Sequence, residues 1–245
     1  MKVVLLGATK GIGRAVARRL AELGHELFLV GRDRVELEKS AADLEQRGAP
    51  NRVGFETCDL EDPNTFESAL TAADATLQGF DTVVVTAGHF ATQDRLEGDL
   101  ELTGRLLNIN FTSTILFCEV VRKMLLSRGG GTLCVFSSVA GERGRKPVIL
   151  YGASKAGLSA YLEGLDHKFR AVGLRTVCIK PGFVKTSMTE GLPVPPFAGE
   201  PEMVAKDVVG AIQKGTPVRY TPSMWALVML VIRHLPRFIM RKVGF

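Results

Sequence analysis

Short apolar runs alternate with longer amphipathic segments along most of the chain. The apolar runs, rich in β-branched residues and leucine, predict buried strands at residues 3–6, 26–30, 53–57, 82–86, 132–136 and 175–180. The amphipathic segments predict helices at residues 12–23, 35–47, 65–77, 100–126 and 151–172. This strand–helix alternation implies an α/β fold, in which a parallel sheet is covered by helices on both faces.

The length of the chain favours one large domain over two small ones. It has 245 residues, of which 46% are hydrophobic, enough for a sizeable core. We expect residues 1–222 to form the main domain and residues 223–245 to be an apolar and basic helical extension of it. Residues 191–201 are rich in proline and glycine, which predicts a long loop of the kind that often covers a site.

The four cysteines point to an intracellular protein. Cys58, Cys118, Cys134 and Cys178 are widely spaced, so we expect no metal site and interpret them as small buried side chains in a reducing cytosol. The apolar run after Met1 is too short for a signal peptide. The run at residues 224–232 is far too short to span a bilayer. We therefore expect a cytoplasmic location.

Positive charge is concentrated at the C-terminus. The chain has a net charge of +5, yet six Lys and Arg residues and no acid follow Asp207. A nucleic-acid-binding face over the whole domain is therefore not indicated. The same tail carries the apolar residues 225–232. This pattern is typical of an element at a membrane surface, and equally of a subunit interface or a wall of a substrate pocket.

A glycine-rich turn lies between the first predicted strand and the first predicted helix. It reads Gly7-Ala8-Thr9-Lys10-Gly11-Ile12-Gly13. Glycines there let backbone N–H groups approach a pyrophosphate at the positive end of a helix. The position of this turn predicts the dinucleotide site of a doubly wound, Rossmann-type sheet.

Residues after the next three strands indicate which dinucleotide binds. Arg32 ends the second predicted strand, where a cation can pair with the 2′-phosphate of NADP(H), and Lys10 adds a second cation. Asp33 complicates this assignment, since an acid near that position favours NAD. Further cofactor contacts are expected after the third and fourth strands, from Asp59, Leu60, Ala87 and Gly88.

Tyr151 and Lys155 form the candidate catalytic pair. Their spacing places both on one helix face. A phenol with a pKa of about 10 is a poor acid–base group at neutral pH, and a nearby cation would lower that pKa. Ser138, just after the fifth predicted strand, can hold a carbonyl oxygen. The three residues suit proton exchange with a carbonyl/alcohol pair during hydride transfer.

Together these motifs resemble the short-chain dehydrogenase/reductase superfamily over at least residues 1–190. The matching segments are GATKGIG, Thr86-Ala87-Gly88, Asn108-Ile109-Asn110, Ser138, YGASK and Pro181-Gly182-Phe183-Val184-Lys185-Thr186. Thr86 departs from the asparagine usual in the family, whose role is structural.

The resemblance also implies roles for individual residues. Asn110 would be a fourth catalytic residue that holds a relay water near Lys155. Lys155 would bind the nicotinamide ribose, Thr186 would contact the carboxamide, and Val184 would lie nearby through its backbone. Pro181 and Gly182 belong to the same cofactor segment. Members of the family usually form homodimers or homotetramers.

The C-terminal half is also similar to the decaprenylphosphoryl-2-keto-erythro-pentose reductases. The similarity rests on residues 137–143, the YGASKAGL run and the tail from Trp225 to Lys242. It implies an NADPH-dependent ketone reductase acting on a 2-keto sugar carried by a lipid phosphate. The alternatives are a reductase of 3-oxoacyl thioesters, a general alcohol dehydrogenase, or an NADP-binding regulatory protein without turnover.

A basic loop lies between Ser138 and Tyr151. Arg143, Arg145 and Lys146 should border the substrate side. They could hold a substrate phosphate, or they could be ordinary solvated cations.

Overall fold

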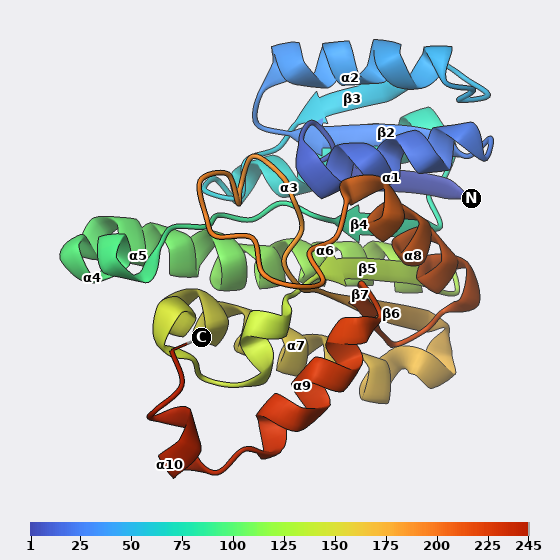
Figure 1. Ribbon diagram of the computed structural model, residues 1–245. Helices are drawn as coiled ribbons and strands as arrows, with labels where there is room; N and C mark the ends of the chain where they lie inside the picture. The colour runs from blue at the N-terminus through green and yellow to red at the C-terminus, as the bar shows by residue number, and fades with distance from the viewer. Residues whose placement is uncertain (245) are drawn as a thin grey trace.

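The computed structural model describes residues 1–244 and shows one parallel sheet at the centre of a single α/β domain (Figure 1). The strands lie in the order β3-β2-β1-β4-β5-β6-β7, and all neighbouring pairs are parallel. Their bounds are β1 Lys2–Leu6, β2 Glu26–Gly31, β3 Gly54–Thr57, β4 Thr82–Val85, β5 Gly131–Phe136, β6 Leu174–Pro181 and β7 Val218–Thr221. The predicted fold class is confirmed, and the six predicted strands differ from these bounds by at most one residue at either end.

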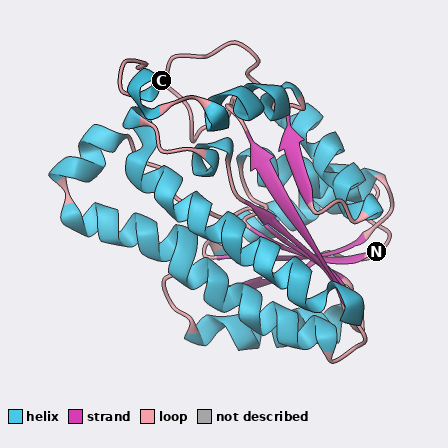
Figure 2. Ribbon diagram, turned by 90° about the horizontal axis from the view of Figure 1, so that it is seen from below, coloured by secondary structure: helices cyan, strands magenta, loops and turns pink. Residues whose placement is uncertain are grey.

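Helices cover both faces of the sheet, as Figure 2 shows. The α-helices are α1 Gly11–Glu22, α2 Arg34–Gln46, α3 Asn64–Leu77, α4 Gln93–Gly98, α5 Leu100–Leu107, α6 Thr114–Leu126, α7 Ile149–Phe169, α8 Pro201–Lys214, α9 Met224–His234 and α10 Arg237–Met240. One core cluster joins α1, α2 and α8 to the sheet. A second joins α3, α6 and α7 to the opposite face. Because both faces are covered, strand residues such as Val3, Val4 and Leu5 are fully buried.

The segment predicted as one helix over residues 100–126 contains a wider turn. A π-helical turn at Asn108–Ser113 separates α5 from α6, and the Thr114 hydroxyl donates to the Ile109 carbonyl at 2.7 Å. The predicted helical character of residues 100–126 is correct, but the helix is not regular along its whole length. Such wide turns are frequent at functional sites, and this one carries Asn110, which is fully buried.

The C-terminal part holds elements that the hydrophobic pattern did not reveal. The long loop between β6 and α8 includes the predicted loop at 191–201, although Pro201 already begins α8. It is drawn in orange in Figure 1, and a bridge between Val184 and Gly199 closes it at its base. Both α8 and β7 were missed. Within residues 1–244, none of the helices has the length and apolar character that crossing a membrane requires.

Candidate active site

Two adjoining cavities open along the carboxyl edge of the sheet. One, of about 550 Å³, is lined by the glycine turn and by Ser138, Tyr151 and Lys155. The other, of about 530 Å³, is lined by Arg32, Asp59 and residues of the same glycine turn. Because they share Gly7, Lys10 and Gly88, they form one continuous groove. This edge is where open parallel α/β sheets bind dinucleotides.

The structure brings nearly all the predicted site residues to this groove. The first cavity holds Gly7, Lys10, Gly11, Ile12, Gly13, Gly88, Ser138, Tyr151, Lys155, Pro181, Gly182, Val184 and Thr186. The second holds Gly7, Thr9, Lys10, Arg32, Asp59, Leu60, Ala87 and Gly88. Asn110 is the exception, because it is fully buried and lines neither cavity.

The glycine turn packs directly against the end of β4. A β-carbon added at Gly13 would lie 2.2 Å from the Gly7 carbonyl oxygen, and one at Gly7 would lie 2.6 Å from the Ala87 nitrogen. The Thr86 hydroxyl lies within donor distance of two carbonyl oxygens, 3.1 Å from that of Leu6 and 2.9 Å from that of Gly7. Thr86 therefore ties β1, the glycine turn and β4 together.

The two residues after β2, Arg32 and Asp33, both line the second cavity. The Asp33 carboxylate accepts a hydrogen bond from the Glu36 backbone at 3.1 Å and caps α2. It is thus engaged with the N-terminus of a helix, where negative charge is stabilised. Arg32 is exposed and lines the second cavity together with Lys10. Asp33 nevertheless lines the second cavity as well, so this cavity holds charges of both signs.

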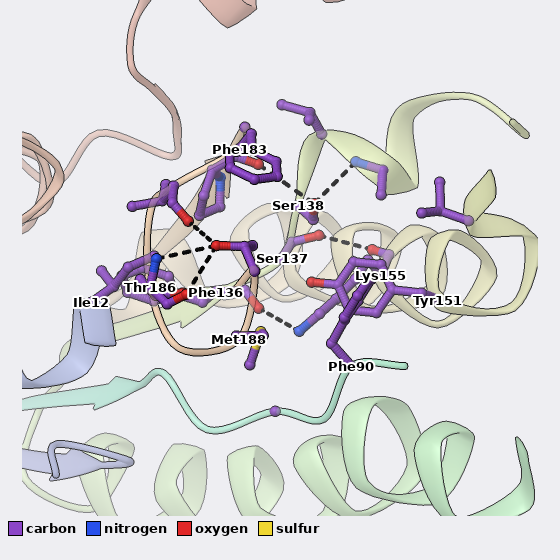
Figure 3. Close-up of a pocket in the computed structure, with 18 of the residues that line it drawn as sticks. Ile12, Phe90, Phe136, Ser137, Ser138, Tyr151, Lys155, Phe183, Thr186 and Met188 are labelled. Carbon is purple, nitrogen blue, oxygen red and sulfur yellow. Dashed lines mark hydrogen bonds between the residues drawn. The ribbon is translucent and has the colours of Figure 1, made fainter. Parts of the chain in front are cut away.

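Lys155 is held in place behind the phenol of Tyr151. Figure 3 shows both side chains projecting from α7 into the cavity, with Phe90 beside Tyr151. The Lys155 ammonium donates to the Phe136 carbonyl at 2.9 Å and lies 5.8 Å from the centre of the Tyr151 ring. The Phe90 ring packs edge-on against that of Tyr151, with centroids 5.2 Å apart. Sequence reasoning missed Phe90, although its place just after Thr86-Ala87-Gly88 could have indicated it.

Burial dominates the protonation of both groups. It raises the pKa of Tyr151 to about 12, while the hydrogen bond with Ser138 acts in the opposite direction. It lowers the pKa of Lys155 to about 8. The expectation that the lysine lowers the pKa of the phenol is therefore wrong for the protein alone, since desolvation has the larger effect. At neutral pH Tyr151 is a protonated phenol, the form that can donate a proton.

The side chain of Asn110 is hydrogen-bonded to the backbone of the loop after β4. Its side-chain oxygen accepts from the His89 backbone nitrogen and its amide donates to the His89 carbonyl, both at 2.7 Å. A β-carbon added at Gly88 would lie 3.2 Å from the Asn110 side-chain oxygen and 3.6 Å from the Lys155 ammonium. The side chain of Asn110 therefore fixes the backbone that passes beside Lys155.

The C-terminal helix α9 forms the far wall of the first cavity. Trp225, Val228 and Ile232 line it, and the Trp225 indole donates to the Phe197 carbonyl at 3.2 Å. Because Trp225 is only 9% exposed, its indole belongs to the interior and is not available to a membrane surface. The inner face of α9 is therefore a wall of the pocket, one of the roles expected for the tail.

Two of the three cations of the basic loop are bonded to the tail. Arg143 donates to the Leu235 carbonyl at 2.9 Å, and Lys146 to the Arg241 carbonyl at 2.7 Å. Only Arg145 lines the cavity. The hypothesis that all three face a substrate phosphate is therefore wrong.

Comparisons with known proteins agree with this geometry. Residues 1–194 match the family model described as short chain dehydrogenase. An uncharacterized oxidoreductase from Mycobacterium tuberculosis is 32% identical, over 98% of this chain and 96% of its own. Carbonyl reductase family member 4 from Xenopus laevis is 30% identical, over 84% of this chain and 88% of its own.

Solved structures show the same fold. A variant of actinorhodin polyketide ketoreductase with NADPH superimposes with a TM-score of 0.80 at 24% identity, over 89% of this chain and 95% of that one. Through its family match and its relatives, the protein is an oxidoreductase that belongs to the short-chain dehydrogenase family.

Proposed function

We propose that this protein uses NADPH to reduce a ketone to a secondary alcohol. The observation that carries the proposal is the placement of Ser138, Tyr151 and Lys155 on one wall of a cavity continuous with the dinucleotide groove. When bound, the cofactor supplies a hydride to the carbonyl carbon. The protein must then orient the carbonyl and protonate its oxygen.

Tyr151 is the proposed proton donor. Its pKa, which burial raises to about 12, leaves the phenol protonated at neutral pH as in a free tyrosine, and the nascent alkoxide needs such a proton donor. Ser138 would hold the carbonyl oxygen at the phenol. Lys155 would stabilise the phenolate that remains and hold the nicotinamide ribose, while Asn110 keeps the neighbouring backbone in place.

The proposed preference for NADPH rests on Arg32 and Lys10. Both line the second cavity, and the neighbouring acid Asp33 is engaged in capping α2. A guanidinium pairs well with a phosphate dianion. NADH lacks that phosphate, so it does not gain the pairing with Arg32.

The substrate is proposed to be largely apolar around its ketone. Phe183, Trp225, Val228 and Ile232 line the cavity, and the loop after β6 adds Met188. A chain or ring with substantial apolar surface would fit this wall. A 2-keto sugar on a lipid phosphate, which the tail resemblance implies, combines such a chain with an oxygenated reacting end.

We also propose that the outer face of α9 and α10 contacts an anionic membrane. Leu227, Leu230, Val231 and Phe238 are 51–65% exposed there. Arg237, Arg241 and Lys242 lie on the same segment, which has no acid. Apolar side chains flanked by cations match the interface of an anionic bilayer. The competing occupant is a second copy of this chain in a homodimer or homotetramer.

The test of the reductase proposal is NADPH consumption with a panel of ketones. The panel contains neutral aliphatic ketones, 3-oxoacyl thioesters and lipid-phosphate ketopentoses. We expect turnover with at least one of them and a loss of at least about 10²-fold in Tyr151→Phe, the usual scale for a positioned acid. Binding of NADPH to that variant, measured by fluorescence, serves as the control for folding. Turnover by Tyr151→Phe at the wild-type rate would exclude Tyr151 as the proton donor.

A further inference from the structure

The wall of the first cavity is apolar on the side of the tail and carries a cation that the reduction does not use. Three cations line this cavity: Lys10, Arg145 and Lys155. Lys10 belongs to the glycine turn, and Lys155 is committed to the Phe136 carbonyl and the phenol. No Asp or Glu of residues 1–244 lines the cavity. Arg145 is thus left without a role in the proposed chemistry.

Arg145 lies half-buried in the wall, and no carboxylate of residues 1–244 pairs with its guanidinium. Its Nε atom is buried and has no hydrogen-bond partner within the described chain. Burial lowers the pKa of its guanidinium, and no carboxylate acts against this effect. A buried N–H donor normally has a partner, because leaving it unpaired costs about 1–3 kcal/mol. An anion that enters the cavity would supply that partner.

The neighbours of Arg145 fix it in this position. Arg143 and Lys146, on either side, are bonded to tail carbonyls. Glu142 accepts from Arg233 and from the Tyr220 hydroxyl, both at 3.0 Å, and pairs with Lys180. These contacts join the basic loop to the C-terminal tail. Arg145 is the cation of this loop that lines the cavity.

We propose that Arg145 binds a phosphate or carboxylate group of an otherwise apolar substrate. This inference rests on the proposed reductase function, because it places the anion and the reacting ketone in one molecule. The 2′-phosphate of the cofactor is not the partner, because the cavity that holds Arg32 and Asp59 does not include Arg145. The pyrophosphate is assigned to the backbone N–H groups of the glycine turn, and saturation with NADP⁺ in the test below keeps it out of the comparison. The anion instead lies on the wall shared with Val228 and Ile232.

The direct test is calorimetric binding to the protein saturated with NADP⁺. Octyl phosphate, octanoate and octanol share an apolar chain and differ in their head group. We expect one of the anions to bind at least about 10-fold more tightly than octanol, the scale of a charge-assisted hydrogen bond in a desolvated site. The comparison of octyl phosphate with octanoate decides which anion is recognised. The single tryptophan, Trp225, lies in the same wall and gives a second, fluorescent readout.

Variants assign the preference to Arg145. Arg145→Gln should lower the ratio of anion to octanol affinity at least about 10-fold, whereas Arg145→Lys should keep part of it. Lys146→Gln removes a neighbouring cation and should keep the ratio within about 2-fold. Circular dichroism and affinity for NADP⁺ report whether each variant folds. Equal binding of octanol and both anions to the wild type, or an unchanged ratio in Arg145→Gln, overturns the inference.

Turnover separates this inference from the proposed function. If the wild type oxidises NADPH with neutral ketones but shows no preference for anions, only the role of Arg145 is wrong. If no ketone is reduced while the anion binds through Arg145, the reductase proposal fails and the binding site stands.

Discussion

Replacing Lys155 with methionine should abolish activity and yet stabilise the protein without its cofactor. The Lys155 side chain is only 4% exposed, and burial lowers its pKa from 10.5 to about 8. The folded state therefore binds a proton at this position less readily than the unfolded chain does. Methionine has a similar volume and carries no charge, so it removes the penalty without opening a cavity.

The magnitude follows from the shift in pKa. A difference of roughly 2.5 units between the folded and unfolded chains corresponds to about 3 kcal/mol. The variant loses the hydrogen bond to the Phe136 carbonyl, which lowers its stability by about 1 kcal/mol. The net gain at pH 7 is therefore about 2 kcal/mol, or about 4–8 °C in Tm for a protein of this size.

The dependence on pH identifies the cause. Above pH 10.5 the lysine is neutral in both states and the penalty vanishes, whereas below pH 8 the penalty is complete. Between these pH values, the difference in stability between the variant and the wild type becomes smaller as pH rises. At pH 9.5 about half of the 3 kcal/mol remains, so the advantage of Lys155→Met should fall to roughly 0.5 kcal/mol.

The assay is urea unfolding of the cofactor-free proteins at pH 7 and at pH 9.5. Lys206→Met, at an exposed position of α8, is the matched control and should change stability by less than about 0.5 kcal/mol. The reasoning is refuted if Lys155→Met is less stable than the wild type at pH 7. It is refuted equally if the gain is the same at both pH values.

Three further changes probe the cofactor site, the pocket wall and the outer face of the tail. Arg32→Ala should weaken NADPH binding at least about 10-fold and NADH binding less than about 2-fold, and equal losses in titrations of both would show that Arg32 does not bind the 2′-phosphate. Gly182→Ala places a β-carbon 2.1 Å from the Trp225 indole nitrogen, so it should displace the indole ring and change its fluorescence. Urea unfolding should show a loss of about 1–3 kcal/mol in stability, and unchanged fluorescence and stability would contradict this packing. Leu227→Ser combined with Val231→Ser should reduce sedimentation with phosphatidylglycerol vesicles at low salt, whereas Val35→Ser on α2 should not; loss of a dimer in light scattering, without any vesicle binding by the wild type, would favour a subunit interface.

The sheet and the chemical type of the site could be predicted from the sequence. Parallel strands covered on both faces leave near-continuous apolar runs, so six of the seven strands could be found within one residue. β7 was missed because its residues Val218–Thr221 contain no apolar run, and Val218 is 43% exposed. Catalytic and glycine motifs were also visible, since their spacing follows from the geometry of one helix or one turn.

Which charges face the site depends on contacts between distant parts of the chain. Arg143, Arg145 and Lys146 are equivalent as a run of cations, and contacts with a tail some ninety residues away take two of them out of the cavity. Likewise, the structure reveals that the Asp33 carboxylate caps α2, which the run of residues after the second strand did not indicate. The burial that raises the pKa of Tyr151 and lowers that of Lys155 comes from residues distant in the chain. Local spacing determines which groups are near one another, whereas long-range packing determines which remain charged, unpaired and open to a substrate.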